Sequence, residues 1–137
     1  MGRLRPLVGE RRLLPRYRTR RTARLFDTTV PDATGQGLRP LLPMVGYTRD
    51  ISETGLAIVV TSESLGGHHD DLVGRELRIL LDLPDGLTQL LGTVVRGLEI
   101  DGEKGGTSYL IGVRITQMDD RAWTDMVRYI LNIKKRL

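Results

Sequence analysis

Two short groups of residues have the chemistry to bind a planar, anionic ligand. The first group is Arg11, Arg12 and Arg16, which has the spacing Arg-x-x-x-Arg with one further arginine in front. An arginine guanidinium is a planar fork of N–H donors that matches phosphate oxygens and the O6 and N7 atoms of guanine, and it also stacks on flat rings. These cations therefore predict contacts to phosphates or to guanine bases.

The second group is Asp50, Ser52 and Gly55, which reads Asp-x-Ser-x-x-Gly and directly precedes an apolar run at 56–60. A carboxylate accepts hydrogen bonds from the N–H edge of guanine, and a serine hydroxyl can bond a base or a phosphate. A glycine permits an unusual backbone angle or the close approach of a ligand. One group supplies donors and the other supplies acceptors, so a guanine dinucleotide would satisfy both.

Each group also has a purely structural interpretation. The spacing Arg-x-x-x-Arg recurs at Arg16/Arg20 and Arg20/Arg24, as an arginine-rich segment produces by chance. Asp50 and Ser52 can instead bond the local backbone of a turn that leads into a strand. The order of the two groups, their separation and the strand that follows favour a binding site.

The N-terminal segment is strongly cationic. Residues 1–24 hold nine arginines and one acid, whereas the formal net charge of the whole chain is +4. Residues 1–16 lack hydrophobic periodicity and contain Pro6, Gly9 and Pro15, so we interpret them as a flexible arginine-rich arm. Such an arm favours a phosphate, a nucleotide, a nucleic acid or a membrane surface as its partner, although a solvated tail or linker has the same composition.

The remaining residues, 17–137, predict one domain built mainly of strands. Alternating apolar residues and turn signals such as Pro84-Asp85-Gly86 indicate antiparallel strands that form a sandwich or a closed barrel. A Gly- and Pro-rich stretch at 27–43 predicts a long loop. The expected strands lie at 17–26, 56–60, 75–83, 87–98 and 108–116.

The C-terminal segment changes its period. From Asp119 to Leu137 the apolar residues, among them Trp123, Met126 and Ile130, recur at helical spacing. Asp119 is placed to cap the helix N-terminus. A single amphipathic helix must cover apolar surface, and one mouth of a barrel would provide it.

Both groups, in this order, resemble the motifs of the PilZ family, R-x-x-x-R followed by [D/N]-x-S-x-x-G. Residues 91–96 (LGTVVR) are similar to a G-x-V-V-R strand of that family. Residues 109–115 (YLIGVRI) are similar to its Y-x-x-G-V-R-F segment, with Ile115 where phenylalanine is usual. The resemblance covers roughly residues 10–137.

This resemblance implies an all-β fold, a six-stranded antiparallel β-barrel with a C-terminal α-helix, that binds cyclic di-GMP on its outer surface. It implies that Arg12 and Arg16 contact guanine bases or phosphates and that Arg11 adds a further cationic contact. Asp50 and Ser52 would engage a guanine edge, and Gly55 would shape the bend.

The resemblance also implies a cytoplasmic receptor rather than an enzyme. Ligand binding would order the mobile arginine arm, which would then signal to a partner protein or an adjoining domain. Motility, exopolysaccharide synthesis and biofilm control are the processes expected of the family.

Two other binding functions remain open at this stage. A PilZ-like domain without the ligand could act as a protein-interaction adaptor, although the intact motifs argue against it. A nucleic-acid-binding barrel would use the basic arm, but such proteins stack bases on aromatic residues, and only Tyr47 and Tyr109 are placed on strands for that role. No nucleic acid polymer is therefore expected as a partner.

Catalytic, metal and membrane functions have little support. His68-His69-Asp70-Asp71 is the one cluster that could hold a metal, and it follows two glycines, so a solvated loop is the simpler interpretation. The chain has no cysteine, which excludes thiolate metal sites, and we expect no cofactor. No apolar run approaches the roughly 20 residues that a membrane helix needs, and no secretory signal is recognised.

Overall fold

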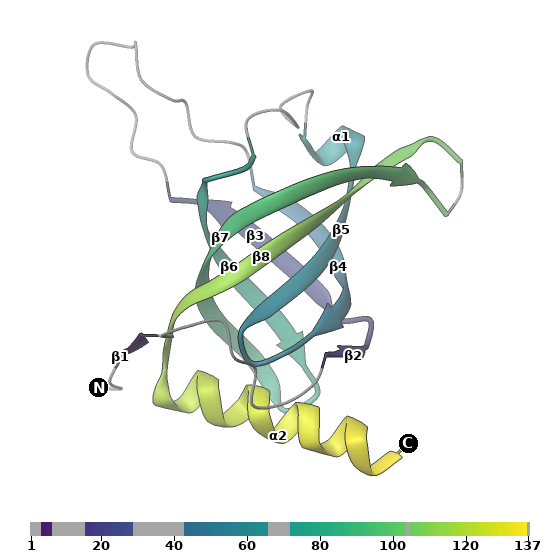
Figure 1. The fold of residues 1–137 in the computed structure, drawn as a ribbon. Coiled ribbons are helices and arrows are strands. Elements are labelled where there is room, and N and C mark those ends of the chain that lie inside the picture. The colour runs from purple at the N-terminus through teal and green to yellow at the C-terminus, as the bar shows by residue number, and fades with distance from the viewer. Residues whose placement is uncertain (1–3, 7–15, 29–42, 66–71, 104, 137) are drawn as a thin grey trace, which may run out of the picture.

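The computed structural model describes residues 4–6, 16–28, 43–65, 72–103 and 105–136. Strands make up most of the fold, and one long helix ends it (Figure 1). The elements are β1 (Leu4–Pro6), β2 (Tyr17–Arg18), β3 (Thr22–Asp27), β4 (Met44–Ile51), β5 (Gly55–Thr61), α1 (Ser62–Leu65), β6 (Glu76–Leu83), β7 (Gly86–Asp101), β8 (Thr107–Asp119) and α2 (Asp120–Arg136).

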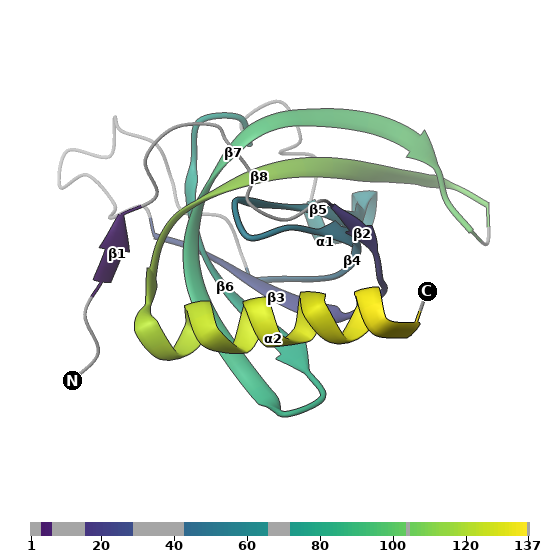
Figure 2. The same cartoon turned by 60° about the horizontal axis from the view of Figure 1, so that its bottom comes forward.

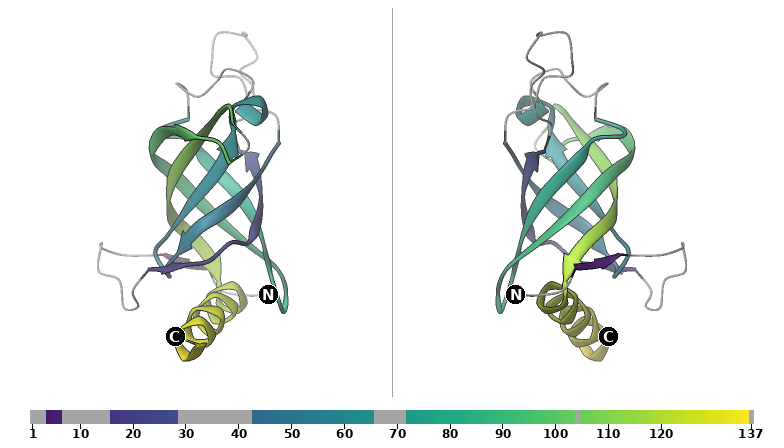
Figure 3. Two further views of the ribbon diagram at one scale, coloured as in Figure 1. Left: turned by 90° about the vertical axis from the view of Figure 1, so that its right-hand side faces the viewer. Right: turned by 90° about the vertical axis from the view of Figure 1, so that its left-hand side faces the viewer.

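Six of the strands close into an antiparallel barrel. The ring runs β3–β4–β5–β8–β7–β6, and β6 pairs with β3 to complete it. Figures 1 and 3 show the closed wall of strands from several sides. The short strands β1 and β2 lie outside this ring and pair with the end of β8 and the end of β4. The predicted six-stranded barrel is therefore confirmed.

The barrel interior is filled by apolar side chains at alternating positions. On β6, the side chains of Leu77, Ile79, Leu81 and Leu83 are buried, as their period of two predicted. The Pro84-Asp85 turn and the positive φ of Gly86 then lead into β7, which pairs with β6. The contributions of the other strands make one continuous core.

Helix α2 closes one mouth of the barrel, as predicted. The Asp119 carboxylate accepts a hydrogen bond from the backbone N–H of Ala122 at 2.7 Å, which is the expected N-cap. Ala122, Met126 and Ile130 are buried against the core. Figure 2 shows the helix lying across this end of the barrel.

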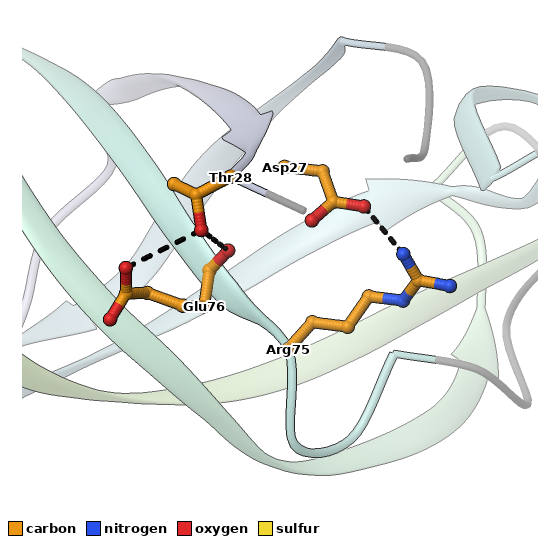
Figure 4. A network of polar contacts seen from close by, with 4 residues as sticks. All are labelled: Asp27, Thr28, Arg75 and Glu76. Carbon is orange, nitrogen blue, oxygen red and sulfur yellow. Dashed lines mark hydrogen bonds and ion pairs between the residues drawn. The ribbon is translucent and has the colours of Figure 1, made fainter. Parts of the chain in front are cut away.

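A buried ion pair joins two strands at the opposite end. Arg75 Nη1 lies 2.5 Å from Asp27 Oδ2, and the two side chains are 5% and 0% exposed. Beside it, the Thr28 hydroxyl donates to the backbone oxygen of Glu76 at 3.0 Å (Figure 4). Because buried charges are costly unless they are paired, this pair fixes the end of β3 against the start of β6.

The prediction of one continuous strand over 17–26 is wrong. Residues 19–21 separate β2 from β3, because the chain bends around the buried side chain of Thr48 on β4. The Thr48 hydroxyl donates to the carbonyl oxygen of Thr19 and accepts from the backbone N–H of Arg21. These bonds hold the bend together with two backbone hydrogen bonds, from Thr19 N–H to the Arg49 oxygen and from Thr48 N–H to the Arg21 oxygen.

Some predictions concern residues whose structure is not described. Arg11, Arg12, most of the loop expected at 27–43, and the cluster His68–Asp71 lie outside the described residues. Strand β1 lies within the segment expected to be a flexible arm, and β4 and α1 were not predicted. Among the described helices, none is both long and apolar enough to cross a membrane.

Candidate functional site

A groove of about 1270 Å³ runs over the outer face of the barrel, across β5, β8 and β7. Four arginines line it, and all four are exposed. They come from four places in the chain: the residue before β2, then β4, β7 and β8. They are Arg16, Arg49, Arg96 and Arg114.

Strand register gives the groove a shallow floor of small residues. Ala57 on β5 is paired with Gly112 on β8, and Gly112 is paired with Arg96 on β7. In the next row, Gly55 is paired with Arg114. Because small side chains stand beside arginines on this face, a ligand can approach the backbone while the cations surround it.

Two β-bulges aim arginines toward the groove. The β4 ladder shifts register between Thr48 and Asp50, which leaves Arg49 as the additional residue. The β7 ladder shifts between Val94 and Arg96, which leaves Val95 as the additional residue. A bulge bends its strand and redirects the neighbouring side chains, and bulges are common beside functional sites.

No acid among the described residues forms an ion pair with the four groove arginines. Within the described ranges, no carboxylate lies within ion-pair distance of any of them. By contrast Arg20, outside the groove, pairs with Glu103 at 2.8 Å and stacks on the ring of Tyr47. Several unpaired cations in one concave surface attract an anion, and phosphate is the group that matches the arginine fork.

Ser52 has a local role in this structure. Its side chain is fully buried, and its hydroxyl accepts hydrogen bonds from the backbone N–H groups of Thr54 and Gly55, at 3.3 and 3.1 Å. The Thr54 carbonyl oxygen in turn accepts from the N–H of Ile115 on β8 at 2.9 Å. Ser52 therefore fixes a turn whose residues Thr54 and Gly55 line the groove.

Gly55 is required by packing between two strands. A Cβ atom at this position would stand 2.8 Å from the carbonyl oxygen of Val113, which is a backbone atom and cannot move aside easily. The absence of a side chain thus lets β5 begin close to β8. The close approach expected at Gly55 is therefore one between two strands.

Asp50 carries an acceptor without a partner. Its side chain is half-buried, and its Oδ1 atom is buried with no hydrogen bond from any described residue. Asp50 is paired with Arg18 on β2, and Arg18 follows Arg16 by two residues. Thr116, which also lines the groove, has a buried hydroxyl oxygen without a hydrogen-bond partner among the described residues. A buried polar atom without a partner is costly, so these two positions suit a ligand that supplies hydrogen bonds.

The structure thus brings part of the predicted site together. Arg16 and Gly55 line the groove, whereas Ser52 and Asp50 belong to the turn and strand that border it. Sequence reasoning missed Arg49, Arg96 and Arg114. Arg96 and Arg114 lie in the G-x-V-V-R and Y-x-x-G-V-R segments that resemble the family. That resemblance could have identified them, but no ligand contact was predicted for either residue.

No candidate metal centre accompanies the groove. Across the residues that the structure describes, no three or more His, Cys, Asp or Glu side chains gather as metal ligands would.

Solved structures of known proteins share this fold. The inhibitor of motility MotI/DgrA from Bacillus subtilis matches with a TM-score of 0.60 and 15% identity, over 93% of this chain and 53% of that one. The MrkH–c-di-GMP complex from K. pneumonia matches with a TM-score of 0.61 and 16% identity, over 94% of this chain and 55% of that one. This chain therefore spans about half the length of both proteins.

A third structure is matched over nearly its whole length. It is the PilZ domain of YcgR from Escherichia coli with c-di-GMP, at a TM-score of 0.56 and 11% identity, over 93% of this chain and 94% of that one. No curated protein sequence matches the chain. The family model of the PilZ domain matches residues 10–132. With most of its length matched by that model, the chain belongs to the PilZ family.

Proposed function

We propose that this PilZ domain is a receptor for cyclic di-GMP and that it binds the ligand in the arginine groove. The observation that carries the proposal is the set of four exposed groove arginines without a carboxylate partner among the described residues. Cyclic di-GMP carries two phosphates and two planar guanines, and guanidinium groups bind both. The MrkH and YcgR structures were solved with this ligand, which supports the same choice here.

Each motif residue has a role in this proposal. Arg16, together with Arg11 and Arg12, contacts phosphates or the O6 and N7 atoms of guanine. Asp50 accepts from the N–H edge of a guanine, once a small movement exposes its buried, unpartnered Oδ1 atom. Ser52 and Gly55 act indirectly, because they hold the turn beside the groove in place.

The segment that follows Arg16 transmits the effect of ligand binding to the rest of the domain. This segment is bonded to β4 through Thr48 and to α2 through Tyr129. Ligand contacts to Arg16 would therefore reorder the arginine arm against a fixed support. The surface formed in this way would contact a partner protein or an adjoining domain in the cytoplasm.

Calorimetric titration with cyclic di-GMP tests the proposal. We expect saturable binding by the unmutated domain and a loss of about 1–3 kcal/mol of binding free energy in Arg16→Ala, as for a bidentate arginine–guanine pair. Arg24→Ala is the matched control, because Arg24 is exposed on β3 and does not line the groove. A domain that folds but binds no cyclic di-GMP would refute the receptor function and leave an adaptor.

A further inference from the structure

The β7 bulge places two consecutive side chains on the outer face of the barrel. Val94 points into the core and is 1% exposed, whereas Val95 is 48% exposed and Arg96 is also exposed. In a regular strand one of these two neighbours would point inward. The bulge therefore turns Arg96 outward, and its side chain lies beside β8.

Arg96 crosses β8 directly above Gly112. A Cβ atom built on Gly112 would lie 3.0 Å from Arg96 Cγ and 3.1 Å from Arg96 Nε. Any residue with a side chain at position 112 would thus push Arg96 away from the strand. The bare backbone of Gly112 is what allows the arginine to lie low along the floor of the groove.

Apolar side chains flank this arginine. Val95 and Leu98 line the same groove and are 48% and 59% exposed. Ala57 continues the row Arg96–Gly112 on the other side of β8 and adds little bulk. A planar cation that lies on small residues and beside exposed apolar groups can stack against the flat face of an aromatic base.

We propose that Arg96 is a stacking platform for one guanine of bound cyclic di-GMP and that Gly112 is the residue that positions it. The inference rests on the proposed function and adds to it a base-binding element on β7 and β8. Its role differs from that of Arg16, which acts through the hydrogen-bonding edge of the guanidinium. Neither Arg96 nor Gly112 belongs to the two motifs from which the site was first predicted.

Titration of variants with cyclic di-GMP tests the platform. Arg96→Ala should weaken binding about tenfold, within the range of base–side-chain stacking. Arg96→Lys keeps the charge but has no plane to stack, so binding should stay at least about fivefold weaker than in the unmutated domain. Gly112→Ala should weaken binding about threefold by lifting Arg96, since the three atoms nearest to its Cβ all belong to that flexible side chain.

A double variant separates positioning from mere packing. In the Arg96→Ala background, Gly112→Ala should change affinity by less than about twofold, because the side chain that it displaces is gone. An undiminished Gly112→Ala effect in that background would show that Gly112 acts in another way. Full rescue by Arg96→Lys would show that charge alone matters and would overturn the stacking role.

The outcomes also separate this inference from the proposed function. If the unmutated domain binds no cyclic di-GMP, the proposed function itself fails. If it binds and Arg96→Ala binds equally well, only the platform is refuted. Should Gly112→Ala fail to fold, as judged by its melting curve, the comparison of Arg96→Ala with Arg96→Lys still decides the question.

Discussion

The hydroxyl groups of Thr19 and Tyr129 share a hydrogen bond although 110 residues separate them in the chain. Thr19 follows Arg16 by three residues, and Tyr129 lies on α2, the helix that closes the barrel. The bond therefore connects the segment that carries the arginine motif to the C-terminal helix. It links α2 to the groove indirectly, through the segment that runs from the groove residue Arg16 to Thr19.

Tyr129→Phe should weaken cyclic di-GMP binding as well as stability. The variant removes one hydrogen bond, which typically contributes about 0.5–1.5 kcal/mol. Arg16 then loses part of its support, so we expect a reduction in affinity of about threefold, since pre-organised groups bind at lower entropic cost. Calorimetry and urea unfolding measure the two effects. Thr124→Ala is the control on the same helix, because among the described residues its hydroxyl bonds only the backbone oxygen of Asp120. Lower stability with unchanged affinity would disprove the link.

Asp27→Ala should destabilise the barrel without affecting the groove. It removes the Asp27 carboxylate from the guanidinium of Arg75, which is 5% exposed. Breaking one side of a buried ion pair costs about 3–5 kcal/mol. We expect this loss in urea unfolding, with cyclic di-GMP affinity unchanged under conditions where the variant is folded. The double variant Asp27→Leu/Arg75→Met should recover much of the loss, and a single variant that loses less than about 1 kcal/mol would contradict this account.

Tyr47 should make stability fall at alkaline pH. Burial raises the pKa of its phenol, and the negative charge of Glu103 and a hydrogen bond to Glu103 raise that pKa further, whereas Arg20 lowers it. The pKa of Tyr47 is therefore higher in the folded protein than in the unfolded chain, in which a tyrosine has its ordinary pKa of about 10. The stability from Tyr47 is fully present below this pH and is lost as the pH rises through the higher pKa of the folded state.

Tyr47→Phe isolates this contribution from the other alkaline groups. Between about pH 8 and about pH 11, the unfolding free energy of the unmutated protein should fall relative to that of the variant, because phenylalanine does not ionise. A constant difference over this range would show that the Tyr47 phenol ionises equally in the folded and unfolded states.

The sequence determined the features that depend on neighbours in the chain. The alternation from Leu77 to Leu83 specified β6, and helical spacing with an Asp119 cap specified α2, because periodicity and capping act over a few residues. The two motifs likewise predicted Arg16 and Gly55, which line the groove, from residue type and spacing alone.

Only the tertiary structure decided what depends on strand pairing. Strand β4 escaped prediction because the bulge at Arg49 breaks its period of two: Met44, Thr48 and Ile51 are buried at uneven spacing. The row Ala57–Gly112–Arg96 joins three strands through register, which partners distant in the sequence determine. Bulges and registers arise when the barrel closes, so the sequence predicted one groove arginine, Arg16, and only the fold brought three more around the same groove.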